Sequence, residues 1–352
     1  MHYSKTALAL TLAGLTASAN AQLEEVVVTA QKVESSLQDT PIAITAFTGD
    51  TLEALGAVNA TDIGDFSPNV SIVKTFGSAG NIRTNIRGVS TGDPSLAVDP
   101  KVGMYVDGAY IARNAGAVFD IVDLERIEIL RGPQGTLWGK NTTGGAINII
   151  TKKPSGEFGF KQSLTFGNFG EFRSLTSVDT SEYGGLSAKL SYYMNDNDGW
   201  ADNTNPVGES DLGSIDTDAY RIALRWDINE QWFADYSYDY NEFDAVPIPL
   251  QITHLGPGAT DPNIVGSFNL ADGSFYPGYN PLNEMLSVLE PEDRLEKFHL
   301  DGTTEEHTEI NGHNLTVVWE GDAITIKSIT AYRDYASELP GNDLDGGSWN
   351  FN

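Results

Sequence analysis

The fold of this chain is decided by the stretch Asp123–Pro154, which reads DLERIEILRGPQGTLWGKNTTGGAINIITKKP. It begins with a short alternating run, Arg126–Leu130, and closes with a second one, Ile147–Thr151, and both are typical of β-strands. Five glycines lie between the two runs. Because glycine tolerates backbone conformations and close approaches that a side chain would block, the stretch predicts two strands joined by a compact loop.

The pair Gly139-Lys140 raises the alternative of a phosphate-binding loop, because it lies in glycine-rich surroundings just after a strand. The Walker pattern would need glycine at the position of Gln134 and serine or threonine at the position of Asn141. Neither position fits. We therefore interpret the stretch as a structural turn and not as a nucleotide site.

The composition excludes several classes of protein. Among 352 residues there are 49 acidic and 21 basic ones, a formal net charge of −28. This excess argues against nucleic acid as a partner, because phosphate contacts need clustered lysine and arginine. Cysteine is absent, which excludes disulfides and thiolate chemistry from the chain.

Side chains for catalysis or metal binding are not grouped along the sequence. No Ser-His-Asp arrangement and no clustered set of metal ligands is visible in it. The five histidines are scattered: His2, His254, His299, His307 and His313. We therefore expect no enzymatic activity, no metal site and no cofactor.

The first residues predict export. Lys5 precedes an apolar run, Ala7–Ala17, and the small residues Ala19-Asn20-Ala21 follow it. This order is typical of a signal peptide, here residues 1–21, and the run is too short to span a bilayer. No other stretch reaches the roughly 18 consecutive apolar residues of a transmembrane helix. We expect a bacterial envelope protein that crosses no membrane by helices.

The segment after the expected cleavage, residues 22–30, predicts an extended strand with a free end. It contains two acids followed by β-branched residues: Glu24, Glu25, Val26, Val27, Val28, Thr29 and Ala30. Such a segment can add itself as a strand to the sheet of another protein. It can also pair within its own domain, and the residues alone favour this second alternative.

Residues 31–154 predict one small α+β domain. Asp50 is the expected cap of a first helical turn that Gly56 ends, and Asn59 is the expected cap of a second turn, Ala60–Phe66. Short strands are predicted over 70–73, 81–88 and 102–108, the last one ending in an Asp-Gly turn.

After Pro154 apolar side chains occupy every second position of successive segments. Seven strands are predicted: 158–167, 171–179, 186–195, 217–228, 231–243, 313–320 and 323–335. Aromatic residues gather towards the strand ends, the other face is polar, and short turns alternate with long loops at 196–216 and 244–312, apart from one short connection at 168–170. These features are typical of an outer-membrane β-barrel with lipid on its outside.

The number of strands predicts an incomplete barrel. Plugged outer-membrane transporters have about 22 strands, and an open sheet would leave unpaired backbone groups in lipid. We therefore expect the region 155–352 to be the N-terminal part of a larger antiparallel transmembrane β-barrel.

The whole chain resembles the N-terminal half of TonB-dependent outer-membrane receptors. The stretch Asp123–Pro154 is similar to the signature of the family's plug domain, from Leu-Glu-Arg-Ile-Glu-Ile-Leu-Arg-Gly-Pro through Trp-Gly to Gly-Gly-Ala-Ile-Asn-Ile-Ile-Thr-Lys. The segments Ile86–Val89 and Tyr105–Gly108 match two further plug motifs. The residues that carry these motifs are Arg87, Gly88, Asp107, Gly108, Arg126, Glu128, Arg131, Gly132, Gly139, Gly144 and Gly145.

The resemblance implies a function and partners. It implies that Glu24–Ala30 is the TonB box, which pairs with the TonB protein, energised by ExbB–ExbD, when ligand binds outside. It also implies active uptake of a scarce ligand, most often a ferric siderophore, across the outer membrane. A carbohydrate, an aromatic compound or cobalamin is the alternative cargo, and a surface structural barrel or phage receptor is the alternative class.

Two expectations about side chains complete the sequence interpretation. The plug apex of the family faces outward, so the ligand candidates are Arg87, Tyr110, Arg113 and Asn114. We also expect Arg126, Glu128 and Arg131 to hold the plug to the barrel wall through ion pairs.

Overall fold

The computed structural model describes residues 26–57, 61–75, 78–91, 98–112, 123–206, 208–248, 266–268, 275–277, 296–298, 300 and 305–338. The expected signal peptide lies outside these residues, as do Glu24, Glu25, Asn59, Arg113 and Asn114. No helix in the described ranges has both the length and the apolar character needed to cross a membrane.

The N-terminal domain is built on a five-stranded sheet with the strand order β3-β9-β10-β7-β8. Its strands are β3 (Ile44–Thr48), β9 (Leu124–Arg131), β10 (Gly145–Thr151), β7 (Val102–Val106) and β8 (Ala109–Ile111). The pair β10–β7 is parallel and the other pairs are antiparallel. A core of buried aliphatic side chains joins this sheet to the helices and to the small sheet β4 (Val70–Lys74), β5 (Ile82–Ile86) and β6 (Val89–Ser90).

The stretch Asp123–Pro154 supplies two adjacent strands of the five-stranded sheet. The two predicted strands are present as β9 and β10, and the helical turn α4 (Gly135–Trp138) lies between them. Gly145 pairs with Arg131, and a Cβ atom at Gly145 would collide with the carbonyl oxygen of Leu130. This close approach of main chain to main chain explains why glycine is needed there.

The two predicted helical turns are present with different N-terminal caps. Helix α2 (Gly49–Leu55) is capped by Thr48, whose Oγ1 accepts from Thr51 N at 3.2 Å, so the expected cap at Asp50 is wrong. Gly56 ends this helix in the left-handed conformation, as predicted. Helix α3 (Asp62–Phe66) follows Thr61, which makes no side-chain cap hydrogen bond.

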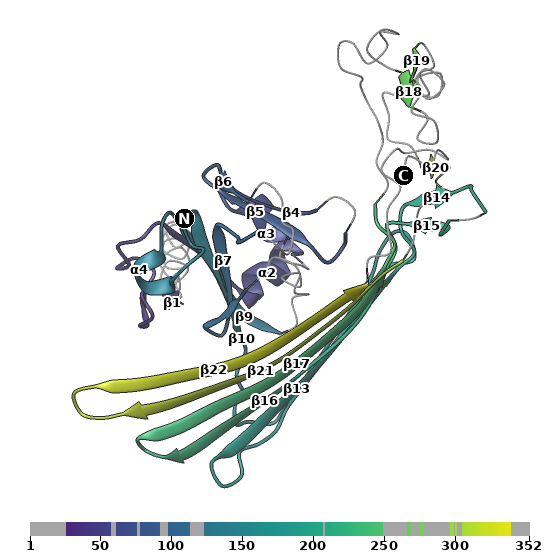
Figure 1. Cartoon of the computed structure of the whole chain (residues 1–352). Coiled ribbons are helices and arrows are strands. Elements are labelled where there is room, and N and C mark those ends of the chain that lie inside the picture. The colour runs from purple at the N-terminus through teal and green to yellow at the C-terminus, as the bar shows by residue number, and fades with distance from the viewer. Residues whose placement is uncertain are drawn as a thin grey trace, which may run out of the picture.

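The second half of the chain forms an open antiparallel sheet of seven strands in sequence order. Its strands are β11 (Gly159–Phe166), β12 (Phe172–Asp179), β13 (Leu186–Asn197), β16 (Ile215–Asn229), β17 (Trp232–Ala245), β21 (Glu306–Glu320) and β22 (Thr325–Glu338). Every predicted strand is present. However, β21 begins at Glu306 and not at the predicted residue 313. The prediction missed the first half of this strand because that half is polar, lies against the N-terminal domain and lacks the apolar alternation of a lipid-facing segment. Figure 1 shows the N-terminal domain beside this curved sheet.

The two faces of the seven-stranded sheet have opposite character. Large apolar side chains are exposed on one face, among them Leu190, Tyr192, Ile222, Trp226, Trp232 and Leu315. The residues between them point to the N-terminal domain and are buried and mostly small or polar, among them Ser177, Ser191, Ala219, Ala223, Ser237 and Thr316. A continuous exposed apolar face with a polar opposite face fits a barrel wall in lipid.

The two long connections carry secondary structure of their own. Strands β14 (Ala201–Asn203) and β15 (Asp211–Leu212) lie in the first, and β18 (Gly266–Phe268), β19 (Phe275–Pro277) and β20 (Lys297–Phe298) in the second. β20 pairs with β14 in parallel, and a small apolar cluster lies under this sheet: Ala201, Leu212, Val246, Phe298 and Leu300. The two connections therefore pack on each other at one end of the large sheet (Figure 1).

Candidate functional site

The N-terminal segment Val26–Ala30 is docked in the N-terminal domain. Strand β1 (Val27–Val28) pairs antiparallel with β2 (Ser35–Ser36). Val28 and Ala30 are fully buried, whereas Val27 is 41% exposed. The described part of the expected TonB box is thus an ordered strand whose alternate side chains enter a core.

A buried carboxylate holds this segment. The Thr29 backbone N–H donates to Glu128 Oε1 at 2.7 Å, and Thr29 Oγ1 donates to the same carboxylate at 3.1 Å. Asn148 Nδ2 lies 3.3 Å from both Thr29 Oγ1 and Glu128 Oε2. Since Glu128 is completely buried on β9, an interior strand of the five-stranded sheet, the domain's sheet fixes the position of the segment.

Aromatic rings cover the end of the segment. Trp138 Nε1 donates to the Ala30 carbonyl at 2.9 Å, and the Lys32 ammonium lies 3.4 Å from the centroid of the Trp138 ring. Burial and the charge of Lys327 lower the pKa of Lys32 to about 8, although Glu128 acts in the opposite direction. The ammonium group of Lys32 is therefore partly buried and partly removed from water while the segment is docked.

The expectation that Arg126, Glu128 and Arg131 bridge to the barrel wall is wrong for the described contacts. Arg126 pairs with Glu125 and with Glu128, its Nε lying 2.9 Å from Glu128 Oε1. Arg131 donates to the Pro68 carbonyl at 3.2 Å. All three side chains bind partners inside the N-terminal domain, because the interior strand β9 is surrounded by other parts of that domain.

Asp107 makes one of the links between the domain and the large sheet. Its carboxylate accepts from Arg221 Nη2 of β16 at 2.7 Å and from the Thr151 hydroxyl at 2.7 Å, and Lys153 lies 3.4 Å away. Burial alone would raise the pKa of Asp107, but the two cations and the Thr151 hydrogen bonds outweigh it and hold the pKa below its ordinary value. The carboxyl is therefore a buried anion compensated from both sides of the contact.

Asp123 makes a second link. It lies 2.9 Å from Lys189 Nζ and accepts hydrogen bonds from Ser177 at 2.8 Å and Ser191 at 3.0 Å, all from the large sheet. Burial acts to raise its pKa, and the Lys189 and Ser177 hydrogen bonds bring it below the ordinary value. Asp123 begins the stretch that decides the fold, so this stretch also anchors the domain to the sheet.

A third link runs in the opposite sense, from an acid of the sheet to the domain. The fully buried carboxylate of Glu306 accepts from Ser78 Oγ at 2.8 Å, Ala79 N at 2.6 Å and Gly80 N at 3.3 Å. A Cβ atom at Gly80 would lie 2.7 Å from Phe243 and 2.9 Å from Glu306 Oε1. The tip of the β4–β5 hairpin therefore fits the sheet only with glycine at this position.

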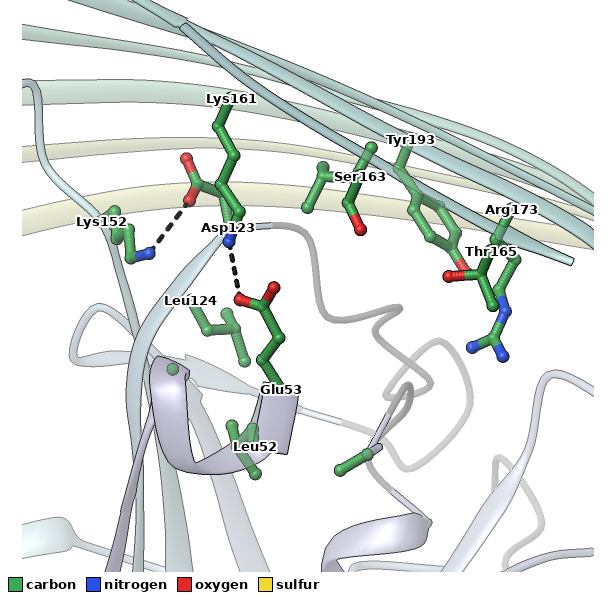
Figure 2. Close-up of a pocket in the computed structure, with 13 residues that line it drawn as sticks. Leu52, Glu53, Asp123, Leu124, Lys152, Lys161, Ser163, Thr165, Arg173 and Tyr193 are labelled. Atoms are coloured by element: carbon green, nitrogen blue, oxygen red, sulfur yellow. Dashed lines mark hydrogen bonds and ion pairs between the residues drawn. The ribbon is translucent and has the colours of Figure 1, made fainter. Parts of the chain in front are cut away.

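A cleft of about 140 Å³ separates helix α2 from strands β11–β13. Figure 2 shows its polar lining, with one ion pair between Lys161 and Glu53 at 2.7 Å and another between Lys152 and Asp123 at 3.6 Å. Arg173 and Tyr193 line the far end. This cleft lies at the β11 edge of the sheet, so we assign no ligand to it.

The described ligand candidates, Arg87 and Tyr110, lie in different surroundings. Arg87 is exposed in the left-handed turn between β5 and β6. Tyr110 accepts from Asn141 Nδ2 at 2.9 Å and packs on the cluster that buries Val28. Tyr110 is thus part of the packing around the docked N-terminal segment.

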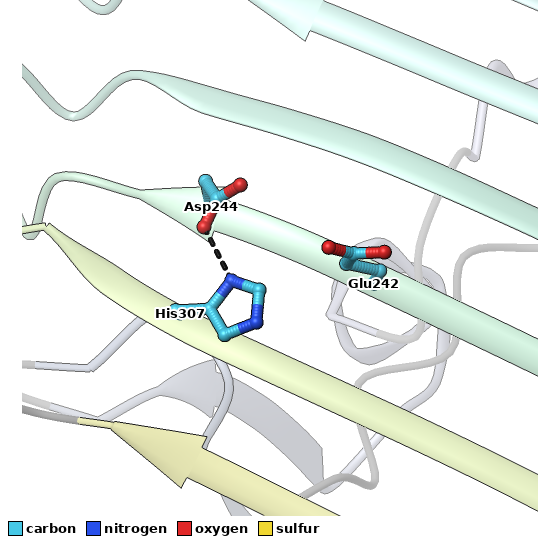
Figure 3. A group of neighbouring side chains, drawn as sticks. All are labelled: Glu242, Asp244 and His307. Atoms are coloured by element: carbon cyan, nitrogen blue, oxygen red, sulfur yellow. Dashed lines mark hydrogen bonds and ion pairs between the residues drawn. The ribbon is translucent and has the colours of Figure 1, made fainter.

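One group among the described residues could converge on a metal ion, and sequence reasoning missed it. Ligand atoms of Glu242, Asp244 and His307 lie within 4.8 Å of one another. Figure 3 shows that they come from the neighbouring strands β17 and β21, far apart in sequence. His307 Nδ1 lies 2.7 Å from Asp244 Oδ1, and Glu242 accepts from the Tyr240 hydroxyl at 2.8 Å, so all three groups already have protein partners. Only the pairing of the two strands could have revealed this group.

Comparisons with known proteins agree with this architecture. Residues 36–146 match the family model for the TonB-dependent Receptor Plug Domain. Over 149 residues the chain is 33% identical to the pesticin receptor of Yersinia pestis, covering 40% of this chain and 21% of that protein. The chain carries the plug domain of the TonB-dependent receptors. The N-terminal domain is accordingly its plug, and the seven-stranded sheet is the first part of its barrel wall.

Other relatives and solved structures extend the similarity over both parts. The vitamin B12 transporter BtuB of Photobacterium profundum is 25% identical over 264 residues, which cover 69% of this chain and 41% of that protein. The crystal structure of the ferric yersiniabactin uptake receptor FyuA from Yersinia pestis has a TM-score of 0.65 at 19% identity, covering 84% of this chain and 41% of that one. The ferric-catecholate import receptor Fiu from Escherichia coli K12 has a TM-score of 0.63 at 16% identity, covering 86% and 40%. The chain spans less than half the length of these relatives, and their names describe receptors and a transporter.

Proposed function

We propose that the complete receptor takes up a scarce ligand, a ferric siderophore, across the outer membrane with energy supplied by TonB and ExbB–ExbD. The observation that carries this proposal is the segment Val26–Ala30 with its short strand β1, which lies in a plug beside a lipid-facing wall. The outer membrane has no nucleotide to drive uptake, so the work must arrive through a mechanical contact, and an extended N-terminal strand can supply that contact by strand addition.

The siderophore as cargo is supported by the relatives. The yersiniabactin and catecholate receptors, whose names state iron-chelate uptake, have folds similar to this chain. The vitamin B12 transporter keeps cobalamin as an alternative cargo, and a carbohydrate or an aromatic compound is a further alternative. Arg87 remains our candidate for ligand contact, because it is exposed and a guanidinium binds anionic groups well.

Substitution of Val27 tests the transport role. Val27→Pro removes a backbone donor of the strand and should abolish energised uptake, while binding of ligand to the receptor stays unchanged. Val33→Ala, at an exposed residue beyond the box, is the matched control and should transport normally. Uptake that survives Val27→Pro would refute the box assignment.

The cargo is tested by direct titration of the complete receptor with ferric siderophores, cobalamin and oligosaccharides. We expect tight binding of a ferric siderophore and increased expression under iron starvation. Constant expression together with binding of another class would refute the siderophore.

A further inference from the structure

The segment Val26–Ala30 has both of its backbone edges engaged. Leu37 N donates to the Val26 carbonyl at 2.9 Å, and β1 pairs with β2 on the same side. In an antiparallel pair, successive residues direct their backbone groups to opposite edges. Val27 and Thr29 therefore direct theirs to the edge that faces away from β2.

Thr29 is already bonded on that outer edge. Its N–H donates to Glu128 Oε1 at 2.7 Å, and its carbonyl accepts from Lys32 N at 2.9 Å. A strand that adds to this edge needs these same groups. The docked conformation therefore blocks the pairing that the proposed TonB contact requires.

The blocking carboxylate is fixed by the plug and not by the segment. Glu128 lies on β9, the second strand of the five-stranded sheet, and is fully buried. Arg126 Nε donates to it at 2.9 Å and Asn148 Nδ2 at 3.3 Å. Hydrogen bonds to an ionised acceptor are about twice as strong as neutral ones, so the carboxylate is a stronger acceptor than an amide in this place.

We propose that Glu128 is the positioning residue that competes with TonB: it occupies the outer edge of the box and keeps the box in the plug. This inference rests on the proposed function, because TonB is the competing strand. A shift of β9 relative to the segment breaks the Thr29 bonds and frees the edge. The strand with the Leu-Glu-Arg-Ile-Glu-Ile-Leu signature then has two roles: it is part of the core, and through Glu128 it holds the box in the plug.

The test measures box exposure and TonB binding separately in the complete receptor without external ligand. This chain contains no cysteine, so Val28→Cys places one thiol at a fully buried position of the box. Cysteines elsewhere in the complete receptor are replaced by serine. The rate of maleimide labelling reports release of the box, and titration with the purified periplasmic domain of TonB reports affinity. Glu128→Gln is compared with Glu125→Gln, an exposed acid of the same strand that does not touch the box.

Glu128→Gln should raise the labelling rate about tenfold or more, through weaker hydrogen bonds to Thr29. It should raise the TonB affinity by the same factor, because the apparent affinity scales with the fraction of receptors whose box is free. Glu125→Gln should change neither. If Glu128→Gln does not fold, Glu128→Asp, which keeps the charge but withdraws it by one methylene, should show the same two increases.

Unchanged labelling in the folded variants would refute the proposal that Glu128 holds the box in the plug. Faster labelling with unchanged TonB affinity would overturn the competition, although the box is held by Glu128. Faster labelling with no TonB binding to any variant would refute TonB as the partner, and thus the proposed function. The role of Glu128 in holding the box would still stand in that case.

Discussion

The ion pair between Asp107 and Arg221 allows a quantitative test of how the plug is held to the wall. The side chains are only 5% and 9% exposed, so solvent screens them little. Removing one partner of a buried pair costs about 3–5 kcal/mol, but each survivor keeps a second partner here. Asp239 lies 3.6 Å from Arg221, and Lys153 lies 3.4 Å from Asp107. We therefore expect Asp107→Asn and Arg221→Met to cost about 2 kcal/mol each, with a coupling energy of about 1–2 kcal/mol.

Hydrogen exchange of the backbone amides in the β7–β8 hairpin of the complete receptor measures this cost as local opening. Each single variant should accelerate exchange by roughly 30-fold, and the double variant by much less than the product. Arg225→Met is the matched control, because Arg225 faces the same side of β16 but pairs with Asp227 and Asp235 of the wall. Strictly additive costs for Asp107→Asn and Arg221→Met would refute the direct ion pair.

Two further predictions concern the hairpin tip and the docked segment. Gly80→Ala should destabilise the tip of the β4–β5 hairpin by about 1–3 kcal/mol through overpacking, which is measured as faster hydrogen exchange over β5. Gly135→Ala is the control and should not change exchange, because the added methyl group meets nothing within 4 Å. Normal exchange in Gly80→Ala would contradict the fit. Docking of the N-terminal segment lowers the pKa of Lys32 to about 8, so protonation of Lys32 favours release of the segment. Docking should therefore strengthen as pH rises from about 8 to about 10.5, and it should stay constant just below that window. A nitroxide at Val27 should lose mobility over this window, and the same change in Lys32→Met would exclude lysine as its cause.

Sequence reasoning succeeded where local periodicity decides the structure. The alternation in Tyr220–Ile228 places apolar residues on the lipid side of β16, and the register of β16 with β13 and β17 keeps them there. The glycines of Asp123–Pro154 predicted a tight connection between two strands, and Gly145 is in close contact with the neighbouring backbone. Both features depend on a few neighbouring residues, so they can be read without knowing the rest of the fold.

Sequence reasoning failed where a partner from a distant segment decides the structure. The first half of β21 was predicted as loop because Glu306 and Thr308 have no lipid-side pattern, yet both are fully buried against the plug. Arg126 and Arg131 were expected to reach the wall, whereas the interior position of β9 in the plug sheet gives them partners inside the plug.

The sequence by itself determined the plug signature, the seven strands and which of their faces meets lipid, because these follow from glycine positions and from an alternation of period two. Only the tertiary structure decided that Asp107 and Asp123 meet Arg221 and Lys189 of the wall, and that Glu128 binds the Thr29 backbone. Glu128 and Thr29 lie 99 positions apart in the sequence, and the donors of a buried carboxylate are those that the fold places beside it. Which donors lie beside Glu128 depends on how the sheet packs, and this packing is why a residue of the plug signature binds the N-terminal segment.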